Sequence, residues 1–124
     1  MANVINWFEI PVANFERATK FYSKVLGTEL APFNNEARDV RMAFFPADSG
    51  EVGGCLIHGD GYKPSAEGTL AYLNGGEDLS ARLSRVESAG GKVVMPKTKI
   101  SDEVGYIALF MDSEGNKVAF HSQN

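Results

Sequence analysis

Hydrophobic and polar residues follow the same order twice along this chain. Residues 4–12 alternate between apolar and polar side chains, which predicts a strand. Residues 14–26 place apolar side chains at helical spacing behind Asn14, a residue type that caps helices, and Gly27 supplies a stop. Three apolar runs of strand length complete this half, at residues 28–33, 40–45 and 54–58. The first half is therefore expected to fold as β-α-β-β-β.

The second half repeats this order. Residues 69–73 predict a strand, and Asp78 can cap a second helix that ends at Gly90 and Gly91. Three more runs of strand length follow, with a loop expected at residues 96–103 after the first of them. These runs lie at residues 92–95, 105–111 and 117–121. The pattern predicts a second β-α-β-β-β module.

Corresponding landmarks of the two halves recur at nearly constant separation. Helix caps, helix-ending glycines and turn aspartates all recur at one identical separation, and a strand-closing histidine recurs one residue sooner. The pairs are Asn14 and Asp78, Gly27 and Gly91, Asp48 and Asp112, and His58 and His121. The alternative is a generic α+β domain with a chance similarity between its halves. Agreement of four landmarks within one residue favours an internal repeat.

The repeat sets the expected domain organisation. Residues 60–67 have the glycine, proline and serine content of a linker between a first module of about residues 1–59 and a second of about residues 68–124. One βαβββ module would leave one face of its sheet bare. Two modules placed edge to edge form an α+β domain of residues 1–124, with a curved, cup-like mixed sheet and the helices on its outer face. A cup of this kind is a place for a small molecule.

Composition narrows the possible partners. The formal net charge is −4 and the sequence pI is about 5.1, which argues against nucleic acid because phosphate binding needs a basic face. The sequence has no apolar stretch of membrane-spanning length and no signal peptide, so no membrane partner is expected. The single cysteine, Cys55, permits no internal disulfide and fits a reducing cytoplasm. It has no adjacent base in sequence, so we expect a core residue and not a nucleophile.

Several short segments have an order and spacing that together carry a family resemblance. They are residues 9–12 (EIPV), the helix start at residues 14–18 (NFERA), Phe21-Tyr22 with residues 25–27 (VLG), residues 89–91 (AGG) and the turn at residues 112–116 (DSEGN). The chain resembles the vicinal oxygen chelate superfamily, which includes glyoxalase I, bleomycin-resistance proteins, fosfomycin-resistance proteins and extradiol dioxygenases. The resemblance implies the fold described above, a small-molecule ligand and a homodimer.

The resemblance also implies where a metal would be held. Enzymes of this superfamily bind a divalent metal through His, Gln and Glu on the first and last strands of each module, and the metal polarises the substrate as a Lewis acid. The matching positions carry Trp7, Leu56, Thr69 or Ala71, and Ala119. None of these residues is a usual ligand for such a metal. We therefore expect no cofactor and no metal at the family positions.

A shifted metal site is an alternative. Glu9, His58 and His121 lie two residues further along three of these strands, where they would keep the inward parity of the family positions. Two histidines and a carboxylate suit iron or another divalent ion, and would support a lyase, isomerase or dioxygenase-type enzyme. Plain placement of polar residues at strand ends explains the same three residues without a metal.

Three functions therefore remain open, and no catalytic residue is assigned. The chain is expected to bind a small molecule in the cup without the usual metal, as bleomycin-resistance proteins do. The alternatives are the shifted-site enzyme and a non-catalytic interaction module whose cup is closed by Trp7, Leu56, Phe44 and Phe110. Trp7 suits stacking against a planar ligand, and equally suits a dimer interface or the core. The expected cup-lining residues are Trp7, Glu9, Leu56, His58, Thr69, Ala71, Ala119 and His121.

Overall fold

Two four-stranded mixed sheets form the protein. The structure is a computed structural model, and it describes residues 3–124. The first sheet has the strand order β1 (Trp7–Pro11), β4 (Gly53–His58), β3 (Val40–Phe44) and β2 (Ala31–Asn35). The second has the order β5 (Tyr72–Asn74), β8 (Lys117–Ser122), β7 (Gly105–Met111) and β6 (Lys92–Ser101). In each sheet the first and last strands of the module pair in parallel and the other pairs are antiparallel. The predicted pair of βαβββ modules is confirmed.

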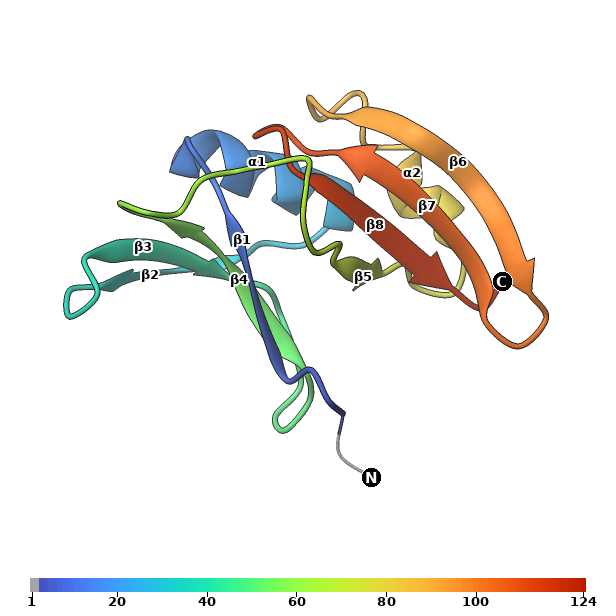
Figure 1. Cartoon of the computed structure of the whole chain (residues 1–124), viewed down its shortest axis with the longest axis horizontal. Helices are drawn as coiled ribbons and strands as arrows, with labels where there is room; N and C mark the ends of the chain where they lie inside the picture. The colour runs from blue at the N-terminus through green and yellow to red at the C-terminus, as the bar shows by residue number, and fades with distance from the viewer. Residues whose placement is uncertain (1–2) are drawn as a thin grey trace.

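The helices lie outside the sheets. Figure 1 shows the sheets as two diverging arms, with β1 and β5 at their inner edges and α1 (Phe15–Leu26) near the top. The second helix, α2 (Ser80–Leu83), lies behind the second sheet in this view. Each sheet therefore has one face that packs toward the helices, the helix face, and an opposite face, the open face. Strand alternation assigns successive side chains to these two faces.

The helix faces of both sheets share one hydrophobic core. Phe21 of α1 lies 6.2 Å from Phe110 of β7 between ring centroids, and Phe110 stacks on Phe120 of β8 at 4.9 Å. All three rings are buried. Residues of both modules therefore exclude water from a single core, which includes Ile10, Val12, Phe15, Ala18, Phe21, Tyr22, Val25, Leu56, Leu73, Leu79, Val86, Ala108, Phe110, Val118 and Phe120.

The first helix forms as its sequence predicts. Asn14 has an extended backbone, and its side chain accepts a hydrogen bond from the Arg17 N–H at 3.0 Å. Gly27 ends the helix in the left-handed conformation, with φ of 70°. Residues Ala18 and Val25 are fully buried on the face that enters the core. The Asn14 cap, the Gly27 stop and the spacing of the apolar residues thus together define this helix.

The second helix is much shorter than predicted. It covers only Ser80–Leu83, and residues 84–90 continue as turns with several i→i+3 hydrogen bonds. The Ser84 and Ser88 hydroxyls donate to backbone carbonyls three residues earlier, which competes with regular helix hydrogen bonding. The Asp78 side chain accepts from the Ser80 N–H and also from the Lys97 ammonium. The segment follows β5 as predicted, but after Leu83 its backbone forms turns in place of the expected helix.

Several strand limits also differ from the prediction. The expected loop at residues 96–103 is wrong, because β6 continues to Ser101 with irregular pairing. Pro96 fits inside it because β6 is an edge strand, where a missing N–H breaks no ladder hydrogen bond on the free side. β5 starts at Tyr72, so Thr69 and Ala71 precede it. β1 and β2 likewise begin three residues later than predicted.

No helix in the described part of the chain, residues 3–124, is long and apolar enough to cross a membrane.

Candidate functional site

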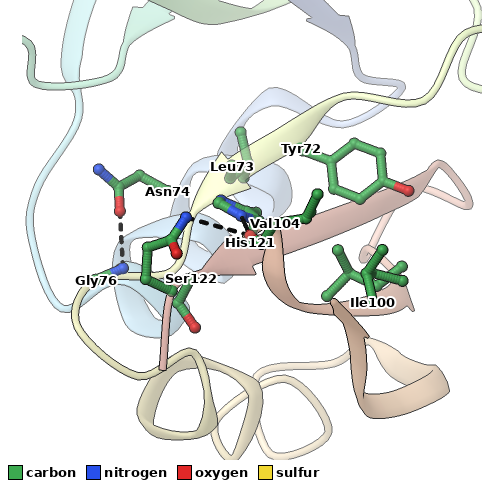
Figure 2. A pocket seen from close by; sticks show the side chains of 10 residues that line it. Tyr72, Leu73, Asn74, Gly76, Ile100, Val104, His121 and Ser122 are labelled. Carbon is green, nitrogen blue, oxygen red and sulfur yellow. Dashed lines mark hydrogen bonds between the residues drawn. The ribbon is translucent and has the colours of Figure 1, made fainter. Parts of the chain in front are cut away.

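A cavity of about 770 Å³ lies on the open face of the second sheet, at the end where β8 finishes. Pairing places Tyr72, Asn74, Ile107 and His121 on that face, because Asn74 and Ile107 both stand opposite His121. Figure 2 shows His121 beside Val104, with Asn74 on one side and Tyr72 and Ile100 on the other. The remaining lining residues are Leu73, Gly76, Ser122 and Gln123.

Hydrogen bonds fix the orientation of His121. Its Nε2 lies at hydrogen-bond distance from the backbone carbonyl of Val104, which also accepts from the Gln123 side-chain amide at 3.2 Å. A carbonyl oxygen only accepts, so Nε2 carries the hydrogen in this arrangement. Nδ1 of the neutral ring is then an acceptor, and it has no hydrogen-bond partner among residues 3–124. His121 can therefore accept a hydrogen bond from a bound molecule.

The walls around His121 are mainly apolar. Tyr72 is 49% exposed and Ile100 is 51% exposed, so both offer apolar surface to a ligand. The Asn74 side-chain oxygen is already engaged by the Gly76 N–H at 2.8 Å. An open, mainly apolar cavity with an imidazole acceptor suits a small, largely apolar molecule that carries a hydrogen-bond donor.

The open face of the first sheet carries aromatic and charged groups. Trp7 meets Phe44 edge to face at 5.9 Å, and Phe44 stacks on Phe33 at 5.7 Å. Glu9 forms an ion pair with Arg38 at 3.2 Å. Arg38 also donates to the Tyr62 hydroxyl at 2.6 Å, so the segment between the modules covers one end of this face. Trp7 and Glu9 thus lie on the open face.

The predicted inward direction of Leu56 and His58 is wrong. β1 and β4 pair with Glu9 opposite Cys55, so Cys55 shares the open face and Leu56 points to the helix face, fully buried in the shared core. His58 Nδ1 donates to the Val12 carbonyl at 3.0 Å, near the start of α1. Counting back from Ala119, the family's metal position on β8, by the separation of the two histidines leads to Leu56. Counting back by the separation of the two turn aspartates leads to Cys55 instead. A one-residue slip of this kind exchanges the two faces of a strand.

The remaining expected site residues, Ala119, Ala71 and Thr69, lie in or next to the second sheet. Ala119 lies on the open face but is fully buried, opposite Tyr72 and Leu109. Ala71 lies beside β8, and its carbonyl accepts from the Ala119 N–H at 3.0 Å. Thr69 is exposed and precedes β5. Of the expected cup-lining residues, His121 lines the cavity at the end of β8, and the other seven line neither that cavity nor the one between the modules.

The alternative in which large side chains close the cup fails for two of the four residues. Leu56 and Phe110 belong to the core on the helix faces, so they do not fill the cup. Trp7 and Phe44 do lie on the open face, yet Trp7 is 46% exposed. The second sheet keeps the cavity around His121.

The residues at the family's metal positions do not fit a divalent metal. Trp7 and Ala119 offer an indole and a methyl group, neither of which is a ligand. The shifted set is not brought together either, because His58 faces the helices and Glu9 is engaged by Arg38. Within residues 3–124, no three His, Cys, Asp or Glu side chains form a group that could hold a metal ion.

Cys55 is the residue that the separation of the turn aspartates relates to the metal position on β8. It is fully buried on the open face beneath Tyr62. Burial, together with the nearby Glu9 carboxylate, raises the pKa of the Cys55 thiol to about 12. The thiol is therefore protonated at neutral pH, and it is neither a nucleophile nor a ready metal ligand.

Sequence reasoning missed most of the cavity. Tyr72, Asn74 and Ile107 were not selected, although Tyr72 and Asn74 alternate with Leu73 as open-face residues do. No sequence feature indicated that Ile100 and Val104 line the cavity. They approach His121 only when β6 and the turn after it fold over the end of β8.

The choice between Leu56 and Cys55, in contrast, had a signal in the sequence. Three of the four landmark pairs share one separation, and only the histidines depart from it. Applying the shared separation to β4 and β8 identifies Cys55 in place of Leu56.

Comparisons with known proteins agree with this fold. The model of the Glyoxalase/Bleomycin resistance protein/Dioxygenase superfamily matches residues 4–120. A Glyoxylase-like domain-containing protein of Didymella fabae is 31% identical over 118 residues, which cover 90% of this chain and 88% of that protein.

Solved structures show the same architecture. A glyoxalase / bleomycin resistance protein from Catenulispora acidiphila matches with a TM-score of 0.66 and 20% identity, over 97% of this chain and 98% of that one. Glyoxalase I from Zea mays matches with a TM-score of 0.68 and 23% identity, over 95% of this chain and 45% of that one. This chain thus spans about half of the maize enzyme. The chain belongs to the glyoxalase/bleomycin resistance protein/dioxygenase superfamily.

Proposed function

We propose that the protein binds a small, planar, largely apolar molecule in the cavity around His121, without the divalent metal of its enzymatic relatives. The observation that carries this proposal is the His121 ring, held by the Val104 carbonyl with Nδ1 left as an acceptor inside an apolar enclosure. A volume of about 770 Å³ suits such a molecule. The ligand would stack on Tyr72 and donate a hydrogen bond to Nδ1.

A matched pair of probes tests this binding. We expect 2-naphthol to bind more tightly than 2-methoxynaphthalene, because only the first can donate a hydrogen bond to Nδ1. The substitution His121→Ala should weaken 2-naphthol binding about 5- to 10-fold, the value of one hydrogen bond with part of its apolar wall. The same substitution should leave the affinity for 2-methoxynaphthalene within about twofold. Isothermal titration calorimetry measures both affinities.

The second histidine provides the control. His58→Gln alters a residue that bonds to Val12 outside the cavity, so 2-naphthol affinity should stay unchanged. Equal affinities of the two probes for the wild-type protein, or equal losses in both histidine variants, would refute the proposed role of His121. Binding should also persist in excess EDTA. A loss that Ni²⁺, Zn²⁺, Mn²⁺ or Fe²⁺ restores would favour the metal-dependent lyase or isomerase instead.

We also propose that the chain works as a homodimer. Trp7, Phe33, Tyr72 and Val94 are each 46–49% exposed, and β1 and β5 have a strand neighbour on one side only within residues 3–124. Apolar surface and free strand edges favour pairing with a second copy. Light scattering should give twice the 13.4 kDa of one chain. A mass of 13.4 kDa at every concentration tested would contradict the proposal.

A cytoplasmic location is proposed with the same function. Cys55, the single cysteine of the chain, is buried as a free thiol in a core cluster with Val40, Met42 and Ile57. A reducing compartment supports this arrangement, since the fold relies on no disulfide.

A further inference from the structure

A second cavity, of about 750 Å³, lies between the modules on the other side of β5. Its apolar walls include Phe8 of β1, Phe45 at the end of β3 and Leu73 of β5. Arg82 of α2 lines the same cavity, together with Asp48 and Glu51 from the turn that joins β3 to β4. The cavity therefore combines aromatic surface with a cation, and it shares β5 and Gly76 with the cavity around His121.

The Arg82 guanidinium has no partner that balances its charge. None of the five ion pairs within residues 3–124 includes Arg82, and its Nε has no hydrogen-bond partner in that part of the chain. Gly76 leaves room for the guanidinium, because a Cβ at Gly76 would lie 2.2 Å from Nη1. The buried Nε is out of reach from the cavity, so a ligand would meet the outer N–H groups of the guanidinium. A carboxylate placed there forms a charge-assisted pair with Arg82.

Another arginine shows how a guanidinium is satisfied in this protein. Arg17 of α1 binds the Glu114 carboxylate, with Nε to Oε2 at 2.7 Å and Nη2 to Oε1 at 3.0 Å. Arg82 has no such partner, because Asp48 and Glu51 line the same cavity but form no ion pair with it.

We propose that this cavity binds a small monocarboxylate with an aromatic or other apolar body. The ligand carboxylate accepts from the outer N–H groups of the Arg82 guanidinium. Its apolar part packs against Phe8, Phe45 and Leu73. Asp48 and Glu51 are exposed at the rim, and their charge disfavours phosphate esters and other dianions. The site is distinct from the one proposed around His121.

NMR titration of the wild-type protein tests the proposal directly. Phenylacetate should shift the Arg82 Nε–H signal and the backbone signals of Gly54 and Gly76, which line the cavity. Phenylacetamide has the same shape without the charge, so it should bind at least about 10-fold more weakly. Equal shifts by the two probes, or no shift of the Arg82 signal at concentrations up to about 10 mM, would overturn the proposal.

Variants then locate the interaction. Arg82→Met removes the charge with little change in volume and should weaken phenylacetate binding by at least about 10-fold, while Arg82→Lys should give an intermediate loss. Arg41→Met removes an arginine that pairs with Glu16 at the surface and should leave the affinity unchanged. Equal affinities of Arg82→Met and wild type would refute the site. His121→Gln should bind phenylacetate as wild type does, so this test fails or succeeds independently of the 2-naphthol experiment.

Discussion

Replacing Glu114 by glutamine is expected to lower the free energy of unfolding by about 2 to 3 kcal/mol, equivalent to a fall in Tm of roughly 10 °C. The Glu114 side chain is fully buried, although it lies in a turn. Its Oε1 accepts from the Ala13 and Asn14 N–H groups at 2.9 and 2.7 Å, and its Oε2 accepts from the Arg17 guanidinium. A glutamine amide turns an NH₂ group toward one of these donors, which leaves a buried donor without an acceptor.

The pH dependence of stability provides a second measure of the same interaction. Burial by itself raises the pKa of Glu114, but hydrogen bonds from Arg17, Asn14 and Ser113 outweigh it and hold the pKa below the ordinary value of 4.5. A lowered folded-state pKa stabilises the protein above pH 4.5, and this contribution is lost as the pH falls through the folded pKa. The difference between wild type and Glu114→Gln should therefore be largest near neutral pH and shrink in acid. Chemical denaturation across this pH range measures it.

An exposed glutamate of α1 provides the control. Glu16 pairs with Arg41 at 2.7 Å, but its side chain is 72% exposed and that of Arg41 is 47% exposed. Solvent screens this pair, so Glu16→Gln should change the free energy of unfolding far less than Glu114→Gln does. Equal effects of the two substitutions would show that the turn of the second module is not held by Glu114.

Replacing Phe110 by alanine is expected to cost about 3 to 5 kcal/mol of unfolding free energy. The ring is fully buried, stacks on Phe120 at 4.9 Å and lies 6.2 Å from Phe21 of the first module. Its removal opens a cavity where the modules meet. Because both modules contribute to this core, the variant should still unfold in one transition, at a lower denaturant concentration.

An exposed phenylalanine gives the comparison. Phe33 of β2 is 49% exposed on the open face, so Phe33→Ala should cost about 1 kcal/mol or less. Circular dichroism and tryptophan fluorescence report on the unfolding of both variants, since Trp7 lies in the first module. Two separate transitions in the Phe110 variant would mean that the modules fold independently and that the shared core is not what joins them.

The turn at residues 112–116 illustrates what local sequence can predict. Its Asp, Gly and Asn residues predicted a tight connection, and Asp112 indeed accepts from the Glu114 and Asn116 N–H groups. The turn also joins distant segments, because Tyr22 donates to Asp112 at 2.7 Å and Asn116 donates to the Pro11 carbonyl at 2.8 Å. These last contacts could not be predicted, since nothing near the turn in sequence indicates its partners.

The candidate sites depended still more on tertiary structure. His121 was selected from sequence, yet its companion Ile100 belongs to a strand segment that the sequence predicts as a loop, and Val104 to the turn that follows it. Arg82 had no distinguishing sequence feature. It becomes a candidate only in the folded chain, where its guanidinium lies in a cavity with Phe8, Phe45 and Leu73 and has no ion-pair partner within residues 3–124.

The amino-acid sequence by itself determined the repeat, the order of strands and helices and the family, because periodicity, caps and turns are local and occur twice. Tertiary structure decided which face each strand presents. Leu56 and His58 point to the helices because Glu9 pairs with Cys55, and this register is set by contact between strands and not within one. A shift of one residue exchanges the faces, so the cup and its residues became known only when the strands were paired.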